Sequence, residues 1–237
     1  MHRAAFREFK TLRAWAKGRT DRPVLGSPGL LRLEEVCNEV GHLTEISALP
    51  AGIGLYDTVD ISGHRNNTAI SAATETGAGA FNVWRNSFAA EYLPAGGSLV
   101  HVDGVPFEFP PVCEGPDNIR CAGQFIRVPE GRYDWIHVLA ASERRSEDTV
   151  ELNFADGSVD AEALRVSDFW AAPPWFGEVR AFESLVMHYP HHVQRGIPAV
   201  MWAQRVPVTR RAGLTGILLP RNVAVHVFAL TLQRTES

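Results

Sequence analysis

From residue 55 onward, this 237-residue sequence is a succession of short apolar segments separated by turns rich in Pro, Gly and Asp. Segments enriched in β-branched and aromatic residues, spaced about 8–15 residues apart, are typical of strands in all-β proteins. The sequence therefore predicts an antiparallel sandwich or barrel with hardly any helix. The predicted strands are 55–61, 81–88, 98–102, 105–109, 123–128, 134–140, 149–154, 163–166, 178–187, 199–208, 214–219 and 224–232.

Two local patterns indicate how some of these strands connect. Asp103-Gly104 suits the positive φ angles of a two-residue type I′ hairpin turn, and 154–158 contains a second Asp-Gly turn. In the strand 134–140, Ile136 and Val138 alternate with other largely apolar side chains. Both faces of that strand are therefore apolar, which predicts a place in the centre of a sheet.

The N-terminal segment differs from the rest of the chain in charge and in periodicity. Residues 1–22 carry seven basic and two acidic side chains, although the whole chain has a net charge of −4. Apolar residues at steps of three and four predict an amphipathic helix over 3–17 that ends at Gly18. We expect a basic helical arm and linker over 1–29 and a single sandwich domain over 30–237. The arm is expected to pack on this domain or on a second subunit in a homodimer, with an anionic membrane surface as the alternative.

Composition restricts the compartment and the class of partner. A pI near 6.1 argues against a nucleic-acid binder that works by bulk charge. The sequence shows neither a secretory signal nor an apolar stretch long enough to span a membrane, so we expect a cytoplasmic protein. The three cysteines match no zinc or redox motif. Free thiols are expected, with a Cys113–Cys121 disulfide as the alternative.

A series of turn and core motifs resembles a known group of folds. The motifs are Val59-Asp60-Ile61, Asn66-Asn67, Glu91-Tyr92-Leu93-Pro94, Gly104-Val105-Pro106-Phe107, Asp117-Asn118-Ile119, Gly123-Gln124-Phe125-Ile126, 154–158 and Ser167-Asp168-Phe169-Trp170. Together, over about 55–232, they resemble the jelly-roll, galactose-binding-like β-sandwiches of carbohydrate-active proteins. The resemblance implies a compact jelly roll that often binds glycans and sometimes holds a structural calcium. It implies no catalytic residue.

The densest group of chemically versatile side chains is His188, His191 and His192. Neutral imidazoles are common ligands of divalent metals, and Glu183 or His226 could supply a third ligand. Pro190 excludes a regular helix across this run, so the spacing of helical zinc motifs does not apply. A histidine-rich surface turn, a ligand-binding loop and a metal site remain open.

A second candidate is the loop that carries Asp168, Trp170 and Trp175. Aromatic faces stack on the C–H faces of sugar rings, and carboxylates accept hydrogen bonds from hydroxyl groups. The same residues could instead close the end of the core. Asn66 and Asn67 are further ligand-binding candidates, and together with Asp60 they could offer oxygen atoms to calcium.

Several reaction classes lack their sequence motifs. The sequence contains no Gly-x-Ser-x-Gly nucleophile elbow, no phosphate-binding loop and no dinucleotide fingerprint. The leading hypothesis is a protein that binds a carbohydrate or glycosylated small molecule. The alternative is a hydrolase or lyase in which His188, His191, Asp168 and Glu183 perform acid–base chemistry. A subunit that serves mainly for assembly is a third reading.

Overall fold

The computed structural model describes residues 54–235, and within them it is an all-β structure with two single-turn 3-10 helices. The predicted N-terminal helix, its linker and the boundary at residue 30 lie outside the described residues. The elements are β1(Tyr56–Val59), η1(Ser62–His64), β2(Ile70–Ser71), β3(Ser87–Ala89), η2(Ala90–Tyr92), β4(Leu99–Val102), β5(Val105–Glu108), β6(Ile119–Arg120), β7(Phe125–Gly131), β8(Tyr133–Ser142), β9(Ser146–Phe154), β10(Val159–Val166), β11(Val179–Tyr189), β12(His192–Pro207), β13(Leu214–Leu218) and β14(Val225–Arg234).

The larger sheet has the strand order β1-β14-β8-β12-β11-β3-β2, with β6 also paired to β14. β8 lies between β14 and β12, which confirms the central place predicted from its two apolar faces. One pairing differs from the antiparallel prediction, because β2 runs parallel to β3. The sheet is therefore mixed.

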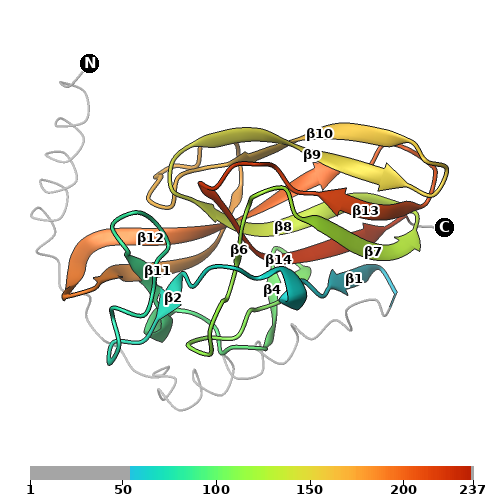
Figure 1. Ribbon diagram of the computed structural model, residues 1–237. Coiled ribbons are helices and arrows are strands. Elements are labelled where there is room, and N and C mark those ends of the chain that lie inside the picture. Colours follow the sequence, from blue (N-terminus) through green and yellow to red (C-terminus); the bar gives the residue numbers. More distant parts are fainter. Residues whose placement is uncertain (1–53, 236–237) are drawn as a thin grey trace, which may run out of the picture. The chain divides into compact units, whose positions relative to one another are not determined.

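A four-stranded sheet, in the order β10-β9-β13-β7, covers one face of the larger sheet and completes a β-sandwich (Figure 1). Side chains of β9 alternate between the core and solvent, with Val150, Leu152 and Phe154 buried. They join Trp202 and Leu230 of the larger sheet in one hydrophobic cluster. Because successive side chains point to opposite faces of a strand, this pattern buries one face of the four-stranded sheet and exposes the other to solvent.

The opposite face of the larger sheet is covered by the β4–β5 hairpin and by loops from the first half of the described chain (Figure 1). A second hydrophobic cluster fills this layer, built largely from phenylalanines: Phe81, Phe88, Phe107, Phe109, Phe169 and Phe228. Phe81 makes edge-to-face contacts with Phe88 and Phe169, at centroid distances of 5.3 and 5.2 Å. The larger sheet is therefore buried on both faces.

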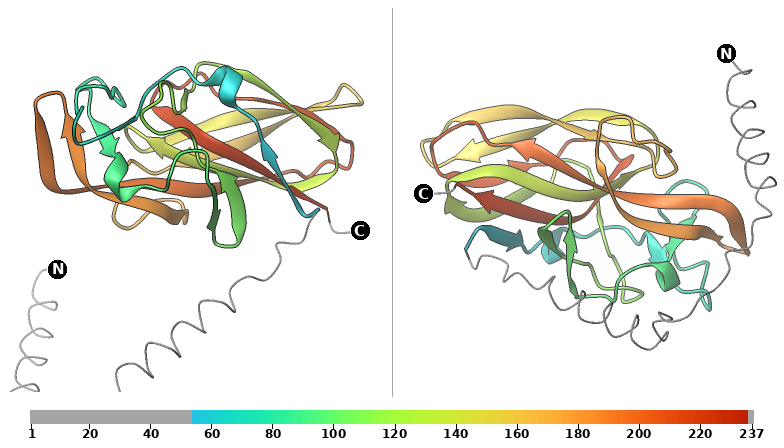
Figure 2. Two further views of the ribbon diagram at one scale, coloured as in Figure 1. Left: turned by 90° about the horizontal axis from the view of Figure 1, so that it is seen from below. Right: turned by 180° about the vertical axis from the view of Figure 1, so that it is seen from behind.

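The hairpin formed by β11 and β12 extends beyond the sandwich (Figures 1 and 2). Only Pro190 and His191 separate its strands, and Tyr189 pairs with His192. β12 begins seven residues before the predicted start at 199, so the histidine run lies at the tip of a regular hairpin. Two register shifts interrupt the pairing, between Arg180 and Phe182 and between Ser184 and Val186.

The Asp103-Gly104 turn is confirmed, because both residues have positive φ, 50° and 79°, between paired Val102 and Val105. The predicted strand 81–88 is wrong for most of its length. Phe81 N–H donates to Asn86 O and Arg85 N–H donates to Asn82 O, so this segment turns back on itself before β3. β2 and β6, each two residues long, carry too little pattern to be predicted.

Candidate functional site

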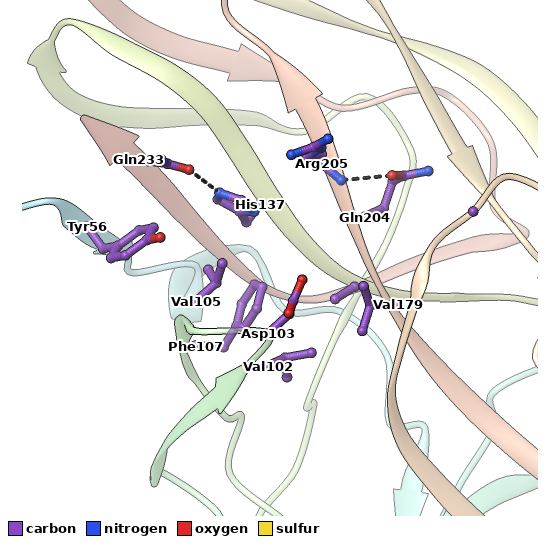
Figure 3. Close-up of a pocket in the computed structure, with 12 residues that line it drawn as sticks. Tyr56, Val102, Asp103, Val105, Phe107, His137, Val179, Gln204, Arg205 and Gln233 are labelled. Carbon is purple, nitrogen blue, oxygen red and sulfur yellow. Dashed lines mark hydrogen bonds between the residues drawn. The ribbon is translucent and has the colours of Figure 1, made fainter. Parts of the chain in front are cut away.

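A cavity of about 350 Å³ lies between the β4–β5 hairpin and the larger sheet, and we call it the hairpin groove (Figure 3). Seven strands or their flanking turns contribute to its wall. Its lining residues are Tyr56, Val102, Asp103, Val105, Phe107, His137, Gly177, Val179, Ala203, Gln204, Arg205 and Gln233. The volume lies within the range of small-molecule sites, about 300–1,000 Å³.

His137 of β8 is held in the hairpin groove by a hydrogen bond and a ring contact. Its Nε2 lies 2.9 Å from Gln233 Oε1 (Figure 3), and its ring meets the Tyr56 ring edge-on at 6.1 Å. Burial lowers the pKa of His137, so the imidazole is neutral at neutral pH. With Nε2–H donating to the amide oxygen, Nδ1 is an acceptor for a ligand hydroxyl group.

Arg205 brings a cation to the same wall. Its guanidinium lies over the Trp135 ring, 4.4 Å from the centroid, a favourable cation–π distance. Among residues 54–235, no carboxylate lies within salt-bridge distance of Arg205. Gln204 Oε1 accepts from the Arg205 backbone N–H at 2.9 Å, which orders this stretch of β12. Arg205 is thus positioned by aromatic stacking, with its donors available to a ligand.

The hairpin side of the groove is apolar with one acidic residue at its end. Val102, Val105 and Phe107 are buried, and Asp103 is exposed at the turn (Figure 3). Thr231 Oγ1 donates to Pro106 O at 2.6 Å and ties the hairpin to β14. An apolar surface facing a set of planar polar groups suits a small ring compound that carries hydroxyl groups.

The predicted aromatic loop presents its two tryptophans to solvent. Trp170 is 50% exposed and stacks on Phe169 at 4.8 Å, and Trp175 is 59% exposed with the Arg145 guanidinium 5.5 Å from its ring. Phe169 is buried in the second cluster, so the core-closing role falls to Phe169 and not to the tryptophans. The Asp168 backbone oxygen accepts from Trp202 Nε1 at 3.1 Å.

The side chain of Glu178 is hydrogen-bonded to the backbone and to a hydroxyl group of this loop. The buried carboxylate accepts hydrogen bonds from Ser167 N–H at 2.6 Å, from Ser167 Oγ–H at 2.9 Å and from Phe176 N–H at 3.1 Å. Both carboxylate oxygens of Glu178 therefore accept hydrogen bonds from the loop. These bonds order the backbone segment from which the two tryptophans project.

The histidine run separates in space. His188 is buried on β11, with its Nδ1 3.0 Å from Ser71 Oγ, whereas His191 and His192 are exposed at the hairpin tip. The His192 ring stacks on Tyr189 at 4.8 Å. No group of three His, Cys, Asp or Glu side chains within residues 54–235 could hold a metal ion. The structure therefore does not bring the three histidines together in one place.

The oxygen donors considered for calcium are engaged within the protein. Asp60 accepts from Ser62 N–H at 2.8 Å, and Asn66 pairs with both backbone groups of Arg120. Asn67 donates to Ala80 O at 2.8 Å. These side chains connect loops to one another, and they do not form a calcium ligand set.

The surroundings of Glu183, Cys113 and Cys121 show no sign of a catalytic or redox role. Glu183 pairs with Arg180 at 2.7 Å on β11. Cys113 and Cys121 are free thiols, so the disulfide alternative is wrong. Burial raises the pKa of Cys121 to about 12, which leaves that thiol unreactive.

Comparison with known families adds one finding. Residues 56–236 match the family described as the AziU2-like β-sandwich domain, and the chain therefore belongs to that family. No curated protein matches the chain. Within the described residues, no helix is long and apolar enough to cross a membrane.

Proposed function

We propose that this protein binds a carbohydrate or a glycosylated small molecule in the hairpin groove. The observation that carries the proposal is the cavity of about 350 Å³ in which the apolar hairpin faces polar side chains of the larger sheet. Both surfaces suit a sugar, because each sugar ring presents C–H faces and a rim of hydroxyl groups.

The polar side chains of the groove complement a neutral or weakly acidic polyol. His137 Nδ1 accepts a hydrogen bond, Arg205 donates several, and Asp103 accepts at the open end. The Tyr56 ring supplies an aromatic edge beside His137. The resemblance of the turn motifs to jelly-roll, galactose-binding-like sandwiches supports the same ligand class.

The exposed tryptophans Trp170 and Trp175 provide a competing location for the same function. We favour the hairpin groove because its polar groups line one cavity, whereas the tryptophans project from a loop. The two locations predict different effects of substitution.

Calorimetric titration with a panel of mono- and disaccharides tests the proposal. His137→Ala removes one ligand hydrogen bond and is expected to weaken binding about tenfold. His101→Ala is the matched control, since His101 is exposed on β4 and does not line the groove. The proposal is contradicted if the unmodified protein binds no saccharide. It is also contradicted if Trp170→Ala and Trp175→Ala abolish binding while His137→Ala binds as tightly as the unmodified protein.

A further inference from the structure

A second polar cluster lies at the other edge of the larger sheet, where β2, β3 and β11 meet. Ser71 of β2, Ser87 of β3 and His188 of β11 are each at most 1% exposed. Ser87 and His188 are directly opposed across the β3–β11 pairing. Ser71 and Ser87, 16 positions apart, thus meet an imidazole that lies 117 positions after Ser71.

Two hydrogen bonds join these side chains, and a carboxylate lies near the far side of the imidazole. Ser71 Oγ lies 2.6 Å from Ser87 Oγ and 3.0 Å from His188 Nδ1. On the far side of the ring, His188 Nε2 lies 3.9 Å from Glu91 Oε2. In the tautomer that places the proton on Nε2, Nδ1 is free to accept from Ser71 Oγ–H, and Ser71 Oγ can accept from Ser87.

This arrangement has the signature of an activated nucleophile. Serine nucleophiles of unrelated folds combine the same three groups, a hydroxyl hydrogen-bonded to an imidazole that lies beside a carboxylate, although here Nδ1 faces the hydroxyl and Nε2 the carboxylate. Ser71 also forms part of the wall of a cavity of about 140 Å³, together with Thr68, Glu75 and Cys113. A space for a small reactant therefore adjoins this residue.

We propose that Ser71 is an acyl-accepting nucleophile, with His188 as its general base and Glu91 as a positioning residue, for esters of short, uncharged acyl groups. The small cavity restricts the acyl chain, and the Glu75 carboxylate in its wall disfavours an anionic one. This activity is separate from sugar binding in the hairpin groove.

The reaction needs only ester and water. Ser71 Oγ attacks the carbonyl carbon while its proton passes to His188 Nδ1. The bond between that carbon and the leaving oxygen breaks, and this oxygen takes the proton from Nδ1. Water then attacks the Ser71 ester and gives its proton to Nδ1, the carbon–Oγ bond breaks, and Oγ recovers a proton, so that one acid and one alcohol are released.

Two small probes test the assignment on the full chain. Incubation with p-nitrophenyl acetate is expected to release p-nitrophenolate and leave an acetyl group on Ser71, located by peptide mass spectrometry. An ethyl fluorophosphonate is expected to form a stable bond to the same oxygen, with loss of fluoride and the Ser71 proton. If the folded protein is modified by neither probe at Ser71, or no faster there than at the half-buried Ser158 of the β9–β10 turn, the proposal is wrong.

Variants separate a catalytic role from a structural one. His188→Gln retains a hydrogen-bond acceptor for Ser71 but lacks the base, so the rate of Ser71 modification is expected to fall about 100-fold or more. Glu91→Gln is expected to retain more of the rate than Glu91→Ala, because a side-chain oxygen still orients the ring. Ser158→Ala, in the β9–β10 turn far from Ser71 in the sequence, is the matched control with an unchanged rate. Modification of Ser71 in His188→Gln at the rate of the unmodified protein overturns the proposal, and circular dichroism verifies that each variant is folded.

Discussion

At the scale of single residues, buried polar side chains hold the loops of the first half of the described chain. Asp117 is the main example, with a fully buried carboxylate that accepts hydrogen bonds from the backbone N–H groups of Ala69 and Ile70 and from Asn118 Nδ2. Asn118 Oδ1 lies 2.8 Å from His226 Nδ1, so the network continues into β14. No sequence pattern identifies such a network, because its members come from separate loops and strands.

Asp117 is predicted to give stability a distinct pH dependence. Burial raises the pKa of this carboxyl from 3.8 to about 6. Between these values the native state holds a proton that the unfolded chain has lost. The contribution of Asp117 to the free energy of unfolding is therefore largest below pH 3.8 and decreases as the pH rises through about 6.

Asp117→Asn isolates this contribution. The variant is expected to lose about 1–3 kcal/mol, because its amide N–H₂ faces backbone donors. The stability advantage of the unmodified protein over the variant should narrow as the pH rises from about 4 to about 6. Denaturant unfolding at several pH values measures both quantities, and a difference that is constant or widens over this range contradicts the assignment.

Glu178 is predicted to control the order of the tryptophan loop. Glu178→Gln replaces one acceptor oxygen by a donor that faces N–H groups, so a loss of about 1–3 kcal/mol is expected. Hydrogen exchange at Trp175 and Phe176 should accelerate in the variant more than exchange in β14. Glu183→Gln, at a partly exposed ion pair on β11, is the control with little change. Unchanged exchange in the loop contradicts the prediction.

At the scale of elements, the secondary-structure predictions were correct where the local sequence pattern agrees with the tertiary environment of the segment. The Asp103-Gly104 turn and the central strand β8 follow directly from turn chemistry and from two apolar faces. The segment 81–88 has the composition of a strand, yet Phe81 and Phe88 are buried in the second cluster from a turn and from β3. A buried segment that forms no β-ladder shows the same apolar pattern as a β-strand. The sequence alone could therefore not distinguish a buried turn from a strand here.

The β4–β5 hairpin is predicted to depend on one buried hydrogen bond for its position. Thr231→Val keeps the side-chain shape but removes the donor to Pro106 O, at a cost of about 1–3 kcal/mol. Faster hydrogen exchange in the hairpin and weaker sugar binding are expected together. Thr149→Val, on the exposed face of β9, is the control that changes neither. If Thr231→Val accelerates hydrogen exchange in the hairpin but binds sugars with unchanged affinity, the ligand does not bind in the hairpin groove.

At the scale of the whole described unit, one sheet is shared by two hydrophobic clusters. Leu152 belongs to the cluster between the two large sheets, and Phe88 belongs to the cluster beneath the hairpin. Because both clusters pack on the same strands, we expect them to unfold together.

Truncation in either cluster tests this coupling. Leu152→Ala and Phe88→Ala are each expected to cost about 2–5 kcal/mol and to shift one common unfolding transition of residues 54–235. Hydrogen exchange across both sheets during denaturant unfolding provides the measurement. Separate transitions for the two clusters would show that the layers are independent.

The candidate site illustrates the limit of sequence reasoning at this scale. Residues from Tyr56 to Gln233 line the hairpin groove, so only the completed sheet order brings them together. Sequence reasoning identified His188 from its neighbours in the run, but its spatial partner Ser71 lies 117 positions away. The sandwich class could be predicted because it depends on periodicity, whereas the position of the site depends on long-range pairing.

Nuclear magnetic resonance titration with the saccharide panel tests whether the ligand occupies the hairpin groove. Saturable shifts of the His137 imidazole, the Gln233 amide and the Arg205 guanidinium, with His101 unchanged, are the predicted result. Shifts centred on the Trp170 and Trp175 indoles, or no saturable shift with any saccharide, would contradict it.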